Sequence, residues 1–182
     1  LPRVVFSTGA YCAPVNLLFS RQINARSAIC MLPGGLGARP FDLAILSLHD
    51  RVVAEKGKNI LTVFGAPNRI TPEFPKRNGD LLREARGLCR KRYIGFLIGG
   101  RSSRCILDPA SIRTALQAIM KYAEKADAGL LLTTSRRTPP AVEQVVEEEL
   151  QGWSRCDLML LAGRSPENPV PGILGLSDLI VV

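Results

Sequence analysis

Residues 93–100, with the sequence YIGFLIGG, decide the fold class of this chain. Their apolar run has the length of a strand that is buried on both faces, and it ends in two glycines. The next segment predicts a helix at residues 109–126, with Asp108 as N-cap and Pro109 at the first helical position. A second strand is expected at residues 128–133. Together these segments predict a βαβ unit with a right-handed crossover.

The same alternation continues on both sides of this unit. Further strands are expected at residues 3–7, 28–32, 41–46, 59–64, 156–161 and 179–182. Further helices are expected at residues 10–21, at about 80–92, and from Pro139 to about Leu150 with Thr138 as cap. We therefore predict an α/β protein of two Rossmann-like units, residues 1–92 and 93–182, with a cleft between them. We expect the first to be incomplete at its start and the second at its end.

Composition narrows the class of protein. Hydrophobic residues make up 46% of the 182 residues and charged residues 22%, which is typical of a folded globular protein. No apolar run approaches the ~20 residues that a transmembrane helix needs. The five cysteines form no C-x-x-C motif and His49 is the single histidine, so we expect no zinc site. Widely spaced cysteines of odd number fit reduced thiols in the cytoplasm.

Charge is divided unevenly along the chain. Residues 1–92 hold 15 Lys/Arg and 6 Asp/Glu, a balance of +9, whereas residues 93–182 hold 9 and 10, a balance of −1. A basic half indicates an anionic partner such as membrane phosphates or a phosphorylated acceptor, or else it serves solubility alone. No aromatic residues are interleaved with the basic ones, which argues against nucleic acid. We expect salt-sensitive binding to anionic membranes through Arg83, Arg86, Arg90, Lys91 and Arg92.

Two polar loops follow predicted strands of the second unit. The first holds Gly99 and Gly100, then Ser102 and Ser103 between two arginines. Glycines allow the backbone to approach a phosphate, although a turn that needs positive φ explains them equally well. Neither the dinucleotide fingerprint nor the P-loop motif is present.

The second loop, TTSRRTPP at residues 133–140, gathers hydroxyl groups and two guanidinium groups before a helix. Helix N-termini attract anions, and Arg binds phosphate oxygens in a bidentate manner. Ser135, Arg136, Arg137 and Thr138 are therefore candidate phosphate ligands. The alternative is a capped helix start with two solvated arginines.

Two other positions are candidates on weaker grounds. His49, next to Asp50, follows a predicted strand and has the residue type of a general base, although a structural or substrate-contact role fits it better. Asn168 lies in a Pro- and Gly-rich turn before the last short helix.

Several phrases resemble the mitochondrial-fission, elongated-mitochondria family. They are LIGG at residues 97–100, TSRRTP at 134–139, NP at 168–169, GIL at 172–174 and SDLIVV at 177–182, with STG at 7–9, HD at 49–50 and GAPNRITP at 65–72 in the first unit. The resemblance covers almost the whole chain, and SRRTP is its most specific part. The chain lacks the family's opening segment, and it also lacks a D-S-x-S-M-x-x-E-like stretch after Val182.

This resemblance implies a metal-independent glycosyltransferase of GT-B type, with a nucleotide-sugar as substrate and no cofactor. Gly99, Gly100, Ser102, Ser103, Ser135, Thr138 and Asn168 would bind the nucleotide-sugar, and Arg136, Arg137 and His49 would take part in catalysis. The acceptor would be membrane-associated or lipid-linked, and the protein cytoplasmic and peripheral to the membrane. The alternative is a non-enzymatic adaptor in membrane or organelle division.

Overall fold

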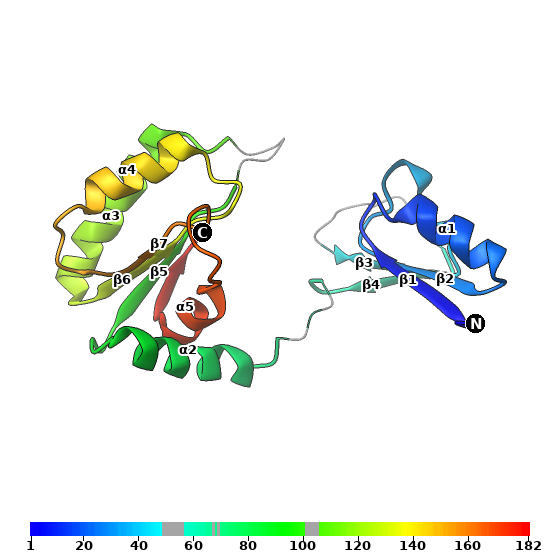
Figure 1. Ribbon diagram of the computed structural model, residues 1–182, viewed down its shortest axis with the longest axis horizontal. Helices are drawn as coiled ribbons and strands as arrows, with labels where there is room; N and C mark the ends of the chain where they lie inside the picture. Colours follow the sequence, from blue (N-terminus) through cyan, green and yellow to red (C-terminus); the bar gives the residue numbers. More distant parts are fainter. Residues whose placement is uncertain (49–56, 67, 69, 101–105) are drawn as a thin grey trace. The chain divides into compact units, whose positions relative to one another are not determined.

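The computed structural model describes residues 1–48, 57–66, 68, 70–100 and 106–182. The chain divides into two compact units, Leu1–Arg69 and Ile70–Val182. Each contains a four-stranded parallel sheet with helices packed against it (Figure 1). The structure therefore confirms the α/β class and the two Rossmann-like units.

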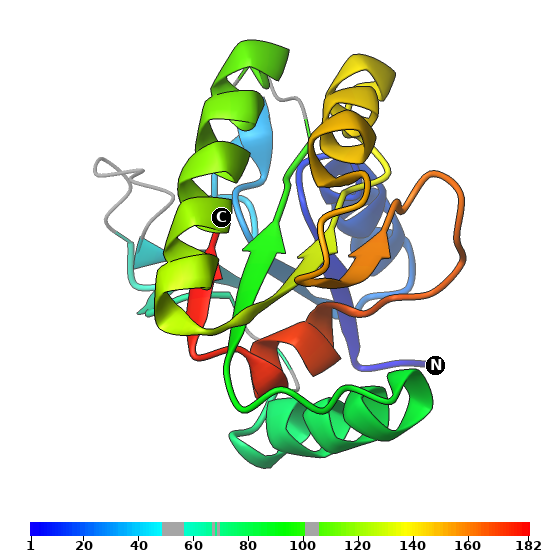
Figure 2. The same cartoon turned by 90° about the vertical axis from the view of Figure 1, so that its left-hand side faces the viewer.

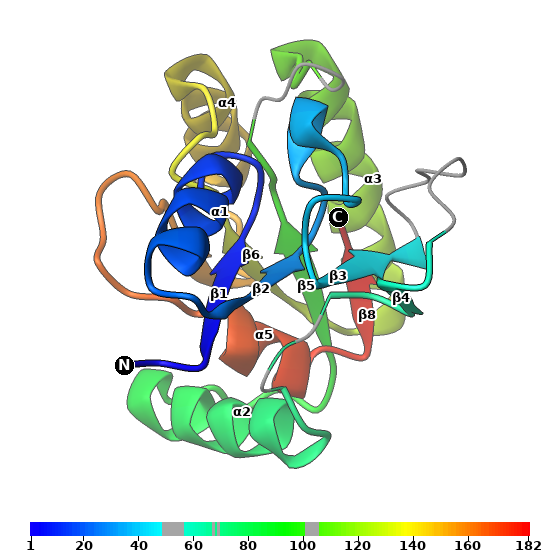
Figure 3. The ribbon, with the colours of Figure 1, turned by 90° about the vertical axis from the view of Figure 1, so that its right-hand side faces the viewer.

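The first unit is a sheet with one helical layer in its described part. Its strands β1 (Val4–Thr8), β2 (Arg26–Cys30), β3 (Leu43–Ser47) and β4 (Ile60–Val63) lie in the order β1-β2-β3-β4. Helix α1 (Ala13–Gln22) connects β1 to β2 and packs on one face of the sheet (Figure 3), and a 3-10 turn, η1 (Gly34–Leu36), follows β2. Pro14 lies in the first turn of α1, as its fixed φ requires. The core consists of Ala13, Leu17, Ile29, Ala38, Phe41, Ala44 and Leu46.

The second unit has three layers. Its strands are β5 (Tyr93–Leu97), β6 (Gly129–Thr133), β7 (Cys156–Leu160) and β8 (Leu179–Val181), in the order β7-β6-β5-β8. Helices α3 (Pro109–Ala126) and α4 (Pro140–Leu150) cover one face, and α2 (Glu73–Arg86) and α5 (Val170–Leu176) cover the other (Figure 2). The chain proceeds from β5 to β7 in one direction and then returns to place β8 beside β5. Ligands of open α/β sheets bind at the carboxyl ends of strands where the order reverses, here between β5 and β8.

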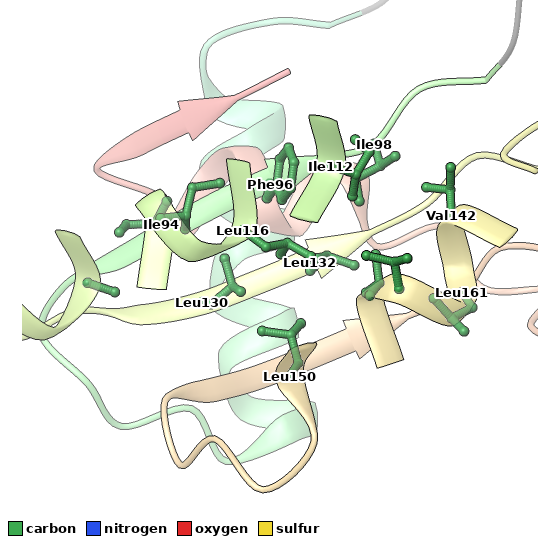
Figure 4. Packing of buried hydrophobic residues seen from close by; sticks show 14 of the residues in the cluster. Ile94, Phe96, Ile98, Ile112, Leu116, Leu130, Leu132, Val142, Leu150 and Leu161 are labelled. Carbon is green, nitrogen blue, oxygen red and sulfur yellow. The ribbon is translucent and has the colours of Figure 1, made fainter. Parts of the chain in front are cut away.

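The larger core of this unit lies between the sheet and the pair α3 and α4 (Figure 4). Alternate residues of β5, Ile94 and Phe96, point to this side, while Tyr93 and Leu97 pack on the α2 and α5 side. Leu116 of α3 and Val142 of α4 are fully buried against the strands. Burying a side chain of this size stabilises the fold by roughly 1.5–3 kcal/mol. This packing fixes the strand ends from which the polar loops emerge.

Helices α2 and α5 are in direct backbone contact. A Cβ atom built on Gly79 of α2 would lie 3.0 Å from the carbonyl carbon of Gly175 in α5. A Cβ atom on Gly175 would overlap the carbonyl oxygen of Pro75, and one on Gly172 would lie 2.8 Å from Leu82. Glycine at these positions lets the two helices approach more closely than any side chain would allow.

The prediction for α2 was wrong at both ends. The helix begins at Glu73 rather than at residue 80, because Pro75 is tolerated in the first turn and Gly79 is required by the contact with α5. It stops at Arg86 because Gly87 adopts a left-handed conformation with φ of 60°. Since α2 packs on α5, the second unit begins at residue 70 rather than at residue 93.

The basic segment 83–92 is largely engaged within the second unit rather than free on a helix surface. Arg83 donates to the carbonyl oxygens of Leu88 and Arg90 at 3.1 and 3.2 Å and lies over the ring of Tyr93. Arg90 forms an ion pair of 2.7 Å with Asp157, and Arg86 forms one with Glu167. Arg92 donates to the carbonyl oxygen of Ala126 at 3.3 Å. The two ion pairs offset the charges of Arg86 and Arg90, whereas the bonds to carbonyl oxygens restrain Arg83 and Arg92 without neutralising them.

Candidate phosphate site at the carboxyl edge of the second sheet

The loop after β6 is bonded to the end of β5 through Thr138. The Thr138 hydroxyl accepts a hydrogen bond from the Ser135 amide at 2.9 Å and donates one to the Gly99 carbonyl oxygen at 2.9 Å. It therefore does not cap α4 as the sequence predicted, because its hydrogen-bonding capacity is used between the two loops. The N-cap of α4 is Pro139, which has no side-chain cap. The described part of the first predicted loop, Gly99 and Gly100, is thus joined to the second.

Gly100 makes this approach possible. A Cβ atom on Gly100 would overlap the Cβ atom of Arg137, whereas one on Gly99 would have no neighbour within 4 Å among the residues that the structure describes. Neither glycine has a positive φ, so the interpretation as a turn that requires positive φ does not apply. Glycine is needed at position 100 because the loop after β6 lies directly against it.

Arg136 and Arg137 present free cations beside this junction. Both residues are exposed, and neither guanidinium group forms a hydrogen bond or ion pair with any other residue that the structure describes. Their backbone is nevertheless restrained, because the Arg137 amide donates to the Ser135 hydroxyl at 3.3 Å. The loop also leads into α4, whose first N–H groups favour an anion. Two unpaired donor forks on a restrained loop are suited to phosphate oxygens.

Arg136 and Asn168 line the same pocket, which has a volume of about 280 Å³. Its walls come from the ends of β6 and β7 and from the loop before α5: Thr133, Thr134, Arg136, Ala162, Pro166, Glu167, Asn168, Pro169 and Val170. The Asn168 side-chain oxygen accepts from the Val170 amide at 3.3 Å, which leaves the amide nitrogen of that side chain for another partner. Glu167 is held by its ion pair with Arg86.

The structure brings together most of the predicted residues of the second unit. Gly99, Gly100, Ser135, Arg136, Arg137 and Thr138 form one junction, and Asn168 joins Arg136 at the pocket. His49, Ser102 and Ser103 lie outside the described residues. Among the described residues, no group of three or more His, Cys, Asp or Glu side chains is placed to hold a metal ion, and no helix is long and apolar enough to span a membrane.

Sequence reasoning missed a buried polar pair at this edge. The Thr134 hydroxyl donates to the Glu143 carboxylate at 2.7 Å and accepts from the Ala162 amide at 2.9 Å. Thr134 and Glu143 are only 6% and 7% exposed. The sequence gives little indication of this pair, because the apolar face of α4 is already accounted for by Val142, Val145, Val146 and Leu150.

The family profile described as mitochondrial fission ELM1 matches residues 1–182, and so includes every residue of this site. The chain belongs to the mitochondrial fission ELM1 family. Membership confirms the resemblance that the SRRTP phrase indicated. No curated protein matches the chain.

Proposed function

We propose that this ELM1-family protein binds a nucleotide-sugar through its diphosphate and transfers the sugar to a membrane-associated or lipid-linked acceptor. One observation carries the proposal: Arg136 and Arg137 extend guanidinium groups that pair with none of the described residues, from a loop that is bonded to the glycine segment after β5. That segment lies where the strand order reverses, which is where open α/β sheets bind ligands.

The proposed sugar transfer requires only positive charge and correct position from these residues. When the bond from the sugar to the phosphate oxygen breaks, negative charge grows on the departing nucleoside diphosphate. Arg136 and Arg137 would stabilise that charge without a metal ion, and preorganised donors of this kind contribute a few kcal/mol to lowering a barrier. Gly99 and Gly100 would allow the diphosphate to approach the backbone, with Ser102, Ser103 and Ser135 as further donors.

Two assignments follow from the resemblance and stay as proposals. Asn168 would contact the nucleotide from the pocket that it shares with Arg136. His49 would contact the acceptor, a role that fits it better than that of a general base. Thr138 takes a different role from the one expected, since its hydroxyl is already bonded to Ser135 and Gly99. It would hold the site together rather than bind the substrate.

Calorimetric titration of the intact protein with a panel of nucleoside diphosphates tests the proposal. The matched variant is Arg136→Lys with Arg137→Lys, which keeps both charges and removes the bidentate geometry. We expect saturable binding by the wild type and at least about 10-fold weaker binding by the variant, since charge-assisted hydrogen bonds are worth roughly 1.5–3 kcal/mol each. Unchanged affinity in a folded variant would reject the phosphate assignment.

A second function is favoured by the family's description, which names mitochondrial fission. In this alternative the protein is a non-enzymatic adaptor that keeps the α/β fold and docks on membranes or proteins through its basic surface. The same titration separates the two functions. An adaptor binds none of the nucleoside diphosphates, and its Arg136 and Arg137 variant retains partner binding.

A further inference from the structure

The buried pair Thr134 and Glu143 has a fixed hydrogen-bond direction. The Ala162 amide can only donate, so the Thr134 hydroxyl must accept from it at 2.9 Å. The single hydroxyl proton of Thr134 is then free to point to Glu143, whose carboxylate oxygen lies 2.7 Å away. The chain of bonds therefore runs from Ala162 through Thr134 to Glu143, and it connects the ends of β6 and β7 with the first turn of α4.

The two arginines lie between two anchored threonines. Thr134 is fixed at one end of the loop by Glu143 and Ala162, and Thr138 is fixed at the other end by Gly99. Only residues 135–137 intervene, and these carry the free guanidinium groups. A binding group that is already ordered loses less entropy when its ligand arrives.

Thr134 is also part of the pocket wall, beside Arg136 and Ala162. Glu143 is not among the residues that line this pocket, so it acts on the site through Thr134. Burial of a charged carboxylate is unfavourable unless it is well compensated, and here the Thr134 hydroxyl and the nearby Arg164 cation both act on Glu143. Glu143 lies next to the start of the loop that carries Arg136 and Arg137, and this location provides a functional reason for a carboxylate at this position.

We propose that Glu143 is a positioning residue that, through Thr134, preorganises the loop carrying Arg136 and Arg137 for a diphosphate. The inference rests on the proposed function, because it assumes that these arginines bind the diphosphate. It assigns no contact between Glu143 and the ligand.

The test compares four variants of the intact protein by calorimetric titration with the nucleoside diphosphate that the wild type binds best. Glu143→Leu and Thr134→Val remove the bond, whereas Glu143→Gln and Thr134→Ser retain an acceptor and a hydroxyl respectively. We expect about 10-fold weaker binding in the first two, from the loss of a buried hydrogen bond, and affinity close to that of the wild type in the other two. Glu148→Leu, which changes an exposed carboxylate of α4 that bonds to Arg113 and Gln144, is the control and should bind normally.

A double-mutant cycle separates positioning from mere stabilisation. Thr134→Val is combined with Arg136→Lys and Arg137→Lys, at a temperature where circular dichroism shows each variant folded. If Thr134 acts through the arginines, its effect on affinity shrinks in that background. Full additivity, or normal affinity in both Thr134→Val and Glu143→Leu, overturns the positioning role and leaves the proposed function standing. A wild type that binds no nucleoside diphosphate overturns the proposed function and this inference with it.

Discussion

The Thr138 hydroxyl lies 2.9 Å from the carbonyl oxygen of Gly99 and 3.4 Å from that of Ile98, and these contacts join the loop after β6 to the end of β5. The same hydroxyl oxygen accepts a hydrogen bond from the Ser135 amide at 2.9 Å, so the hydroxyl acts as both a donor and an acceptor. Because Thr138 is buried, no solvent molecule can easily replace either bond. The junction therefore depends on a side chain with both a donor and an acceptor.

We expect Thr138→Val to destabilise the protein by about 1–3 kcal/mol, since it keeps the shape of the side chain and leaves the Ser135 amide and the Gly99 carbonyl without their partner. Urea unfolding followed by circular dichroism measures the change. Thr138→Ser restores the hydroxyl and should recover most of the loss. Equal stability of the Val and Ser variants would show that the bond contributes little.

Gly100→Ala should disturb the arginine loop, whereas Gly99→Ala should not. The new methyl group at position 100 would overlap Arg137, but at position 99 it would meet no described residue within 4 Å. Neither position has a positive φ, so strain in the backbone does not complicate the comparison. We expect the free energy of unfolding to fall by about 1–3 kcal/mol only in Gly100→Ala, because overpacking of this kind forces the neighbouring backbone to shift, and urea unfolding measures the change. Similar stabilities of the two variants would contradict the packing argument.

Gly175→Ala should separate α2 from α5. The added methyl group would overlap the Pro75 carbonyl oxygen, which belongs to a backbone that cannot rotate away. Overpacking of this kind costs about 1–3 kcal/mol or more, which exceeds the gain of up to about 1 kcal/mol from replacing glycine within a helix. Thermal unfolding of Gly175→Ala and Gly163→Ala provides the measurement. At Gly163 the methyl group would have ordinary contacts, at 3.8 Å from Glu143, so a similar loss in both variants would count against this account.

The cysteines should differ in reactivity. Burial raises the pKa of the Cys156 thiol to about 11, with a further contribution from the nearby Asp157 charge, so the thiol remains protonated at neutral and mildly alkaline pH. Thiolate is the reactive form, and Cys12 and Cys89 are exposed. At pH 8 a thiol reagent should label Cys12 and Cys89 in the folded protein, and Cys156 only after unfolding or as the pH approaches 11. Mass spectrometry of peptides locates the label, and rapid labelling of Cys156 in the folded protein at pH 8 would refute this order.

The sequence predicted β5 and β6 well because each is a short apolar run followed by a glycine- or hydroxyl-containing turn, whereas the starts of β2 and β3 were misplaced by two residues. Helix α3 was predicted with its correct bounds, since the Asp108 carboxylate caps it by accepting from the Ser111 amide at 2.9 Å. The bounds of helix α2 were predicted wrongly, because its packing depends on the contact between Gly79 and Gly175. Local helix propensity carries no information about a contact between residues so distant in sequence. For the same reason the unit boundary was placed too late in the chain.

The sequence was enough to predict which residue types form the candidate site, but it was not enough to predict the hydrogen bonds between them. The arginines, glycines and hydroxyl groups follow strands, so the parallel topology alone places them at one edge. That Thr138 would bond to Gly99 rather than cap α4 depends on how closely two loops approach, which Gly100 determines. Glu143 escaped notice because a carboxylate in a helix normally faces solvent.

The glycine contact between α2 and α5 also sets an order of events during synthesis. Gly79 and Gly175 are far apart in the chain, so α2 leaves the ribosome long before its partner is made. At about 5–20 residues per second, the delay amounts to roughly 5–20 s. During this interval the face of α2 that will contact α5 has no partner helix. Pulse proteolysis of ribosome-arrested chains should therefore show α2 becoming protease-resistant only after α5 has emerged.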